Sequence, residues 1–171
     1  MWAEGAIALA GTARLVRIGG GAMQKAVQVG VGAMGALVGL DFAAATEIEK
    51  EAAGDEVCQA ANDNDPGQVV VSGHKAAVER AVELAKERGA KRAVLLPVSA
   101  PFHCALMQPA ADRMAQALAD VAIQAPVVPL VANVRAEAVT DPVVIRKLLV
   151  EQVTGSARWR DSAEGLGASG V

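Results

Sequence analysis

The chain has 171 residues, of which 53% are hydrophobic and only 2% aromatic, and its formal net charge is −3. This length permits one domain or a domain with a small lobe, and the lack of a basic stretch argues against a nucleic-acid partner. No apolar run could span a bilayer, no signal peptide is evident, and Cys58 and Cys104 lack paired spacing, so we expect a cytoplasmic protein without disulfides or membrane contact.

Two helices are predicted before residue 30. The first begins at Met1 and has no capping residue before it. The second extends from Thr12 to about Val27, but Gly19-Gly20-Gly21 lies in its middle, and each glycine costs about 1 kcal/mol relative to alanine in a helix interior. We therefore predict that either the helix is interrupted at these glycines or something has been lost there. They are a weak candidate for a phosphate loop, because no strand precedes them.

Residues 32–98 predict strands and helices in the order β-α-β-β-α-β, which is typical of a ferredoxin-like split unit. The predicted strands are 32–40, 56–61, 68–72 and 92–98, and the predicted helices are 43–53 and 75–88. The turn-forming residues 62–67 join the second and third strands, and Gly89 ends the second helix. An RNA-recognition role requires aromatic residues on the sheet, and these strands have none.

His103 follows an apolar run that ends at Pro97, and the proline at 101 favours a turn before a helix predicted over 105–120. A histidine at such a strand-to-helix corner can exchange a proton near neutral pH. The alternative is a turn histidine that caps the helix or fills space. Further on, the sequence predicts a buried strand at 125–133 and a helix at 141–152. A loop at 154–159 and a last helix at 160–166 are predicted to follow.

Five sequence blocks together resemble the malonyl-CoA:acyl-carrier-protein transacylases, a family of acyltransferases of fatty-acid biosynthesis. The blocks are RLVR…AMQ (14–24), GAMGALVGL (32–40), NDNDPGQVVVSGH (62–74), LPVSAPFHCALMQPAADRM (96–114) and APVVPLVANV (125–134). The resemblance covers residues 2–171, and PFHCALM is its most specific block. It implies an α/β fold in which an α/β-hydrolase-like large domain (1–29 and 95–171) carries an inserted ferredoxin-like small domain (30–94).

The resemblance also assigns site residues. His103 matches the family's catalytic histidine, the general base that activates a serine as malonyl leaves coenzyme A and again when the carrier thiol attacks. Gln152 matches the residue whose backbone carbonyl orients that histidine, although it can also be read as a polar residue at a helix end. Asn62 and Asn64 match a polar turn beside the cleft, where substrate contact is possible but a turn role is favoured.

Two features depart from the family pattern. The chain has no Gly-x-Ser-x-Gly nucleophile motif, so we expect no nucleophile in it and no malonyl transfer by the chain alone. We also expect truncation at both ends, because the first predicted helix starts uncapped at Met1 and the chain stops where a further strand would be expected. Gly19 aligns with the arginine that binds the malonyl carboxylate, and glycine cannot form that bidentate pair. Arg17 is about 200° away around a helix and is a poor substitute, which puts malonyl selectivity in question.

The implied substrates and partners are malonyl-CoA and acyl carrier protein, with the chain acting as a monomer. We expect neither a cofactor nor a metal, because no cluster of His, Cys, Asp or Glu has ligand spacing. One alternative is a non-catalytic module that binds an acidic carrier protein through its basic residues. These are Arg14, Arg17, Lys25, Arg158 and Arg160. Another alternative is a gene fragment without a stable fold, whose uncovered apolar surface invites aggregation.

Overall fold

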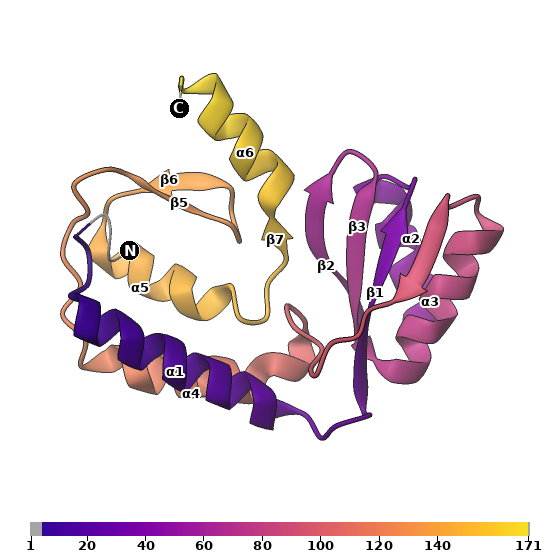
Figure 1. Cartoon of the computed structure of the whole chain (residues 1–171), viewed down its shortest axis with the longest axis horizontal. Coiled ribbons are helices and arrows are strands. Elements are labelled where there is room, and N and C mark those ends of the chain that lie inside the picture. Colours follow the sequence, from indigo (N-terminus) through magenta and orange to yellow (C-terminus); the bar gives the residue numbers. More distant parts are fainter. Residues whose placement is uncertain (1–4, 171) are drawn as a thin grey trace.

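The computed structural model describes residues 5–170, which form an elongated mixed α/β structure of two parts (Figure 1). The sheet part comprises β1 (Gly32–Val38), α2 (Phe42–Ala53), β2 (Cys58–Asp65), β3 (Gln68–His74), α3 (Lys75–Glu87) and β4 (Arg92–Leu95). The helical part comprises α1 (Leu9–Ala26), the 3-10 helix η1 (Ala105–Met107), α4 (Gln108–Ala119), β5 (Leu130–Ala132), β6 (Glu137–Val139) and α5 (Pro142–Glu151). From there, β7 (Ala157–Arg158) and α6 (Trp159–Ala168) return the chain to the sheet.

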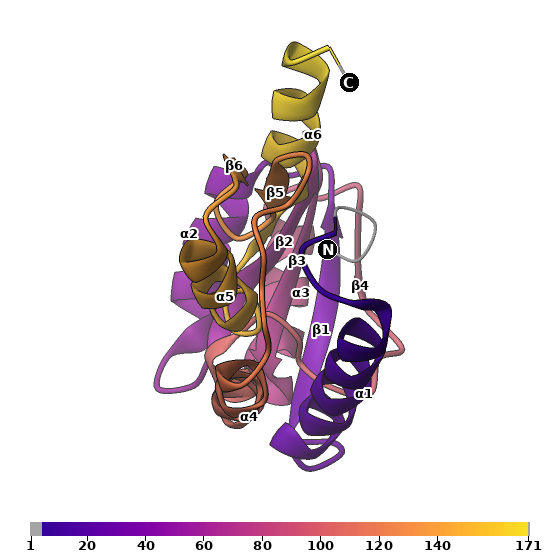
Figure 2. The ribbon, with the colours of Figure 1, turned by 90° about the vertical axis from the view of Figure 1, so that its left-hand side faces the viewer.

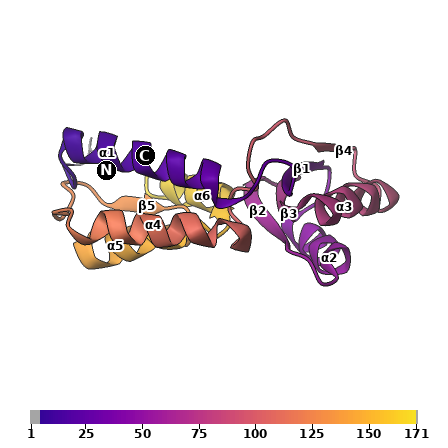
Figure 3. The same ribbon diagram turned by 90° about the horizontal axis from the view of Figure 1, so that it is seen from below.

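The sheet has the strand order β4-β1-β3-β2-β7, with β1 to β4 antiparallel and β7 parallel to β2. Helices α2 and α3 cover one face, on the side away from the helical part (Figure 3). Alternation along β1 places Leu37 in the core under these helices and Met34 in a small cluster on the opposite face. Gly35 allows close packing of α3, since a Cβ there would lie 2.9 Å from Val82 Cγ2.

The predicted order of elements in the sheet part is observed, but β2 is longer than predicted. It continues through Asn62 and Asn64 to Asp65, and the turn is confined to Pro66 and Gly67. The prediction of a turn over 62–67 was therefore wrong. Asn62 pairs with Val70 on one side and with β7 on the other, so hydrogen bonds on both edges extend the strand despite its turn-forming residues.

The glycines do not interrupt α1, contrary to the prediction of two helices. The helix runs without a break from Leu9 to Ala26, residues 5–8 are not helical, and the predicted start at Met1 lies outside the described residues. Helix α1 packs side by side with α4 (Figures 2 and 3), and Leu15 contacts the same apolar cluster as Leu118. This burial offsets the low helix propensity of the glycines.

The helices after residue 140 agree with the predictions from sequence, whereas the predicted buried strand over 125–133 does not form as expected. Asp141 caps α5 by accepting a hydrogen bond from Val143 N–H at 2.7 Å, and Pro142 occupies the first turn, as predicted. Of the predicted strand 125–133, only the partly buried β5 forms, and Val127 is 82% exposed. Proline lacks the N–H that a central strand needs, and two prolines precede β5. Within residues 5–170, no helix is both long and apolar enough to cross a membrane.

Candidate active site

His103 lies in the turn between β4 and η1, and its backbone is left-handed, with φ 58°. This conformation costs an L-residue roughly 1–2 kcal/mol, so surrounding contacts must impose it. Pro101 is buried against Gly32, where a Cβ would lie only 2.3 Å from Pro101 Cγ. The Cys104 thiol donates a hydrogen bond to the Pro101 carbonyl at 3.2 Å. The turn is thereby anchored on both sides of the histidine.

The imidazole of His103 is oriented by two backbone carbonyls that follow α5. Its Nδ1 lies 3.0 Å from the Gln152 oxygen and 3.2 Å from the Gly155 oxygen. Carbonyls only accept hydrogen bonds, so Nδ1 carries the proton and donates, and Nε2 of the neutral ring keeps its lone pair. Gly155 allows this segment to pack closely against Val134, because a Cβ at 155 would lie 2.7 Å from Val134 Cγ2.

Two cavities of opposite character meet at His103 and Gln152. The first, here called the apolar cavity, has a volume of about 560 Å³ and lies between α1, α4 and α5. It is lined by Ile7, Thr12, Leu15, Val16, Gly19, Gly20, Met23, Phe102, His103, Met114, Leu118, Leu149, Gln152 and Val153. The second, here called the polar cavity, has about 240 Å³ and is lined by Asn62, Asn64, His103, Asn133, Val134, Gln152, Gly155, Ala157 and Trp159.

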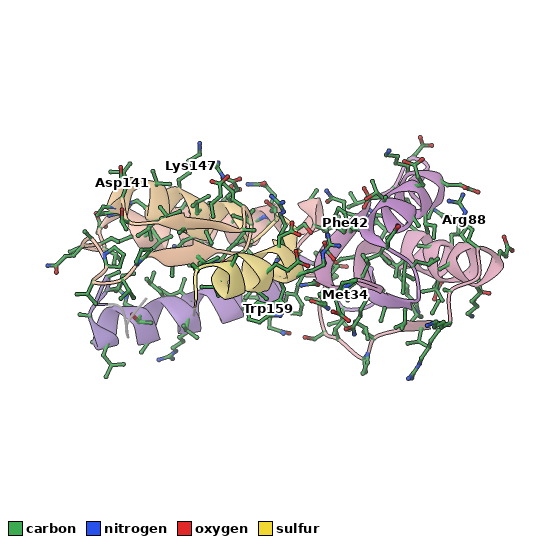
Figure 4. The ribbon with its side chains drawn as sticks, turned by 90° about the horizontal axis from the view of Figure 1, so that it is seen from above. Met34, Phe42, Arg88, Asp141, Lys147 and Trp159 are labelled. Atoms are coloured by element: carbon green, nitrogen blue, oxygen red, sulfur yellow. The ribbon has the colours of Figure 1, made fainter. Side chains whose placement is uncertain are left out.

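The polar cavity collects three asparagines from two distant segments. Asn62 and Asn64 lie on β2, and Asn133 follows β5 in the helical part. Figure 4 shows Trp159, another lining residue, at the start of α6 where the two parts meet. Sequence reasoning missed Asn133, although it lies in the block 125–134 that carries the family resemblance. Only the folded chain brings it beside Asn62 and Asn64.

Gly19 is buried in the wall of the apolar cavity, on the same side of α1 as Leu15. Arg17 is exposed and lines a different groove, of about 600 Å³, between α1 and α4. Arg14, Lys25 and Arg113 line that same groove. The structure thus separates Arg17 from His103, and no lysine or arginine among residues 5–170 lines the apolar cavity.

The thiols and the acidic groups give no sign of another reactive centre. Burial raises the pKa of the Cys58 thiol to about 12 and also raises the pKa of Cys104, so both thiols stay protonated and unreactive near neutral pH. Within residues 5–170, no group of three His, Cys, Asp or Glu side chains is placed to hold a metal ion. The titratable group best placed for chemistry in the two cavities is therefore His103.

A family model described as "Acyl transferase domain" matches residues 1–163. The malonyl CoA-acyl carrier protein transacylase of Salmonella typhimurium is 48% identical over 167 residues, which are 98% of this chain and 54% of that protein. The protein of that name from Bacillus subtilis is 41% identical over 170 residues, 99% of this chain and 54% of its own length. The chain thus spans about half the length of the curated relatives it matches.

Solved structures of similar proteins superpose on the whole chain. The acyl-carrier-protein-S-malonyltransferase from Bartonella henselae is 56% identical, with a TM-score of 0.96 over 100% of this chain and 55% of that one. A malonyl-transacylase in complex with its type II PKS acyl-carrier protein is 41% identical, with a TM-score of 0.97 and coverage of 100% and 55%. Both likenesses extend over the sheet part and the helical part.

Proposed function

The chain belongs to the acyl transferase domain family, and from that premise we propose that it is the histidine-bearing part of a transacylase. This enzyme would move an acyl group, malonyl according to the relatives' names, from coenzyme A to the phosphopantetheine thiol of a carrier protein. One observation carries the proposal: two carbonyls hold His103 in the tautomer of a general base, where an apolar and a polar cavity meet.

His103 would transfer one proton in each half of the reaction. In the first half, Nε2 takes the proton of a serine hydroxyl as its oxygen attacks the thioester carbonyl, and returns it to the departing coenzyme A sulfur. In the second half, Nε2 takes the proton of the carrier thiol and returns it to the serine oxygen as the ester breaks. The Gln152 and Gly155 carbonyls accept from Nδ1–H throughout and stabilise the transient imidazolium.

The polar cavity fits the arm that coenzyme A and a loaded carrier protein have in common. Phosphopantetheine contains two amides, and the side-chain amides of Asn62, Asn64 and Asn133 each offer both donors and an acceptor. An arm held there places its thioester next to His103, with the acyl group directed into the apolar cavity. We therefore assign substrate contact to these asparagines, in place of the turn role favoured for Asn62 and Asn64 by sequence.

The same proposal gives the two parts their place in the family fold. The strand order β4-β1-β3-β2, with α2 and α3 on one face, supports a ferredoxin-like small domain over residues 30–94. Residues 1–29 and 95–171 would then belong to an α/β-hydrolase-like large domain. The nucleophile is absent from this part, since no Gly-x-Ser-x-Gly occurs in the sequence. We accordingly propose that the 171 residues alone do not catalyse transfer, and that they act as a monomer in the cytoplasm.

A second candidate function, a module that binds an acidic carrier protein without turnover, is supported by the groove between α1 and α4. Arg14, Arg17 and Lys25 are exposed there and form no ion pair with any carboxylate of residues 5–170. Arg158 and Arg160, predicted for the same role, instead pair with Asp161 and Asp63. This second function predicts that reversing the charges at 14, 17 and 25 weakens the binding of an acidic protein. It also predicts that Asn62→Ala has no effect on that binding.

The proposed function is tested by titrating the full chain with malonyl-CoA and following His103 by NMR. The ring nitrogen shifts of the free chain should show a proton on Nδ1, and the thioester should perturb His103 together with the side-chain amides of Asn62 and Asn133. Asn133→Ala should weaken binding, whereas Gln124→Ala, at an exposed position that lines neither cavity, should not. A proton on Nε2, or perturbations confined to other regions, would refute the assignment.

Mass spectrometry of the same mixture tests the missing nucleophile. We expect the mass of the chain to be unchanged after incubation with malonyl-CoA. A stable malonyl adduct would show that a nucleophile is present after all, and its position would identify the residue.

A further inference from the structure

The apolar cavity beside His103 is where the acyl group of a bound thioester would lie, and within residues 5–170 its lining has no acidic or basic side chain besides the His103 imidazole. None of the residues among 5–170 that line it is a lysine, arginine, aspartate or glutamate. Eight of the fourteen are aliphatic or thioether side chains, and six of these eight come from α1, α4 and α5, including Leu15, Met114 and Leu149. An ionised carboxylate in this cavity would lose its hydration without gaining a cation.

Gly19 is the position at which a cation on α1 would enter this cavity. It is buried, and a Cβ built there would lie 3.1 Å from Met114 Sδ and 3.9 Å from Met114 Cε. The thioether of Met114 therefore faces the space that a longer side chain at 19 would cross. The next residue, Gly20, also lines the cavity and has nothing within 4 Å of its Cβ position, so it adds room without polarity.

The cations closest in sequence to Gly19 cannot replace one in the cavity. Arg14, Arg17 and Lys25 are exposed and line the separate groove between α1 and α4, with Arg113. Because α1 is one unbroken helix, the glycines do not let Arg17 turn towards His103. The division between a charged outer groove and an uncharged inner cavity is therefore fixed by the helix itself.

The cost of burial in this cavity differs between charged and uncharged acyl groups. Burying an unpaired carboxylate is strongly unfavourable, whereas each methylene or methyl group buried among aliphatic side chains is favourable. We propose that the apolar cavity binds an uncharged aliphatic acyl group in preference to malonyl, and that Gly19 is the residue that determines this preference. The proposal rests on the proposed function, since it requires a thioester bound beside His103.

Two thioesters, one with an uncharged and one with a charged short acyl group, test this preference in the full chain. S-butyryl-pantetheine and S-malonyl-pantetheine have the same arm, and their binding can be followed through ¹³C-labelled methionine methyl groups, because Met23 and Met114 line the cavity. We expect the butyryl thioester to bind at least about tenfold more tightly. In Gly19→Arg, malonyl affinity should rise by about tenfold or more, because a guanidinium pairs with a carboxylate in bidentate geometry.

Two control variants separate charge from size and position. Gly19→Gln adds a long uncharged side chain at the same site, and Gly21→Arg adds the same charge at an exposed position that lines the outer groove. Neither should raise malonyl affinity. All three substitutions replace a glycine within α1 by a better helix former, so the helix should be retained, which circular dichroism would verify.

Each outcome decides the proposal. Equal or tighter binding of the malonyl thioester to the unmodified chain would overturn it while leaving the proposed function intact. An equal gain of malonyl affinity in Gly21→Arg would also overturn it, because the charge would then act outside the cavity. If neither thioester shifts Met23 or Met114, both this inference and the proposed function fail. Should Gly19→Arg not fold, the butyryl-to-malonyl ratio of the unmodified chain still decides.

Discussion

In the sheet part, α2 and α3 enclose a cluster of fourteen buried residues against the sheet, whereas the corresponding cluster of the helical part, within residues 5–170, has three: Ile7, Leu15 and Leu118. The helices of the helical part instead present apolar side chains to a cavity of about 560 Å³ that reaches His103. In the sheet part, the apolar faces of α2 and α3 and the alternating apolar residues of the strands bury one another. The helical part keeps an open apolar space next to the proposed base, which is what a substrate or a covering polypeptide requires.

The largest difference in stability between the two parts should appear when a buried isoleucine in each part is replaced by alanine. Ile48 on α2 and Ile145 on α5 are both 0% exposed, but Ile145 also lines a cavity of about 190 Å³. Ile→Ala substitutions cost about 2–5 kcal/mol, and the cost depends on how tightly the site is packed. We expect Ile48→Ala to lie near the upper end and Ile145→Ala near the lower end, as measured by urea unfolding. Equal losses would contradict the contrast in packing.

The turn that carries His103 depends on the sheet part, and Gly32→Ala tests this dependence. The new methyl group would meet the rigid ring of Pro101 at 2.3 Å, so the turn must shift, and we expect a loss of about 1–3 kcal/mol. The displaced His103 should also lose its Nδ1 hydrogen bonds, detectable in the ring nitrogen shifts. Gly20→Ala is the matched control, because its Cβ has open space and alanine should stabilise α1 by up to about 1 kcal/mol.

Local sequence signals predicted those features that depend on neighbouring residues. The amphipathic pattern of α3, and the Asp141 cap and Pro142 of α5, are set within one or two helical turns and were predicted correctly. The turn at His103 followed from the proline at 101, which restricts the backbone before it. The family resemblance added Gln152, whose carbonyl the structure places 3.0 Å from His103 Nδ1, although its role in catalysis stays a prediction.

Features that depend on distant partners were missed or predicted wrongly. The glycine stretch of α1 stays helical because α1 packs against α4, which places Met114 next to Gly19, and nothing near Gly19 in the sequence reveals that contact. Asn62 and Asn64 have turn composition, yet Asn62 pairs with both β3 and β7, and Asn64 lies in the same strand at an irregularity between the paired residues Asp63 and Asp65. Asn133 joins the polar cavity only when the helical part lies against β2. In each case, tertiary contacts outweigh local propensity.

The smallest expected effect concerns the joint between the two parts. Asp63 on β2 is 3% exposed, and its Oδ2 lies 2.8 Å from Arg160 Nη2 on α6. The other carboxylate oxygen of Asp63 has no hydrogen-bond partner among residues 5–170. Burial raises the pKa of the Asp63 carboxyl above its ordinary value of 3.8, an effect that exceeds the lowering by the Arg160 charge. The ion pair therefore compensates only part of the cost of burying the carboxylate.

This balance between burial and ion pairing predicts how the stability contributed by Asp63 changes with pH. A carboxyl group whose pKa is raised by folding stabilises the fold in its protonated form, and that contribution is lost as the pH rises through the folded pKa. Asp63→Asn stays neutral, so its free energy of unfolding should increase relative to the unmodified chain between about pH 3 and neutrality, by about 1 kcal/mol or less. Urea unfolding at successive pH values measures this difference, and Asp65→Asn, at an exposed position of β2, is the control. If the difference instead falls with pH, attraction to Arg160 outweighs burial, and the joint is held by its ion pair.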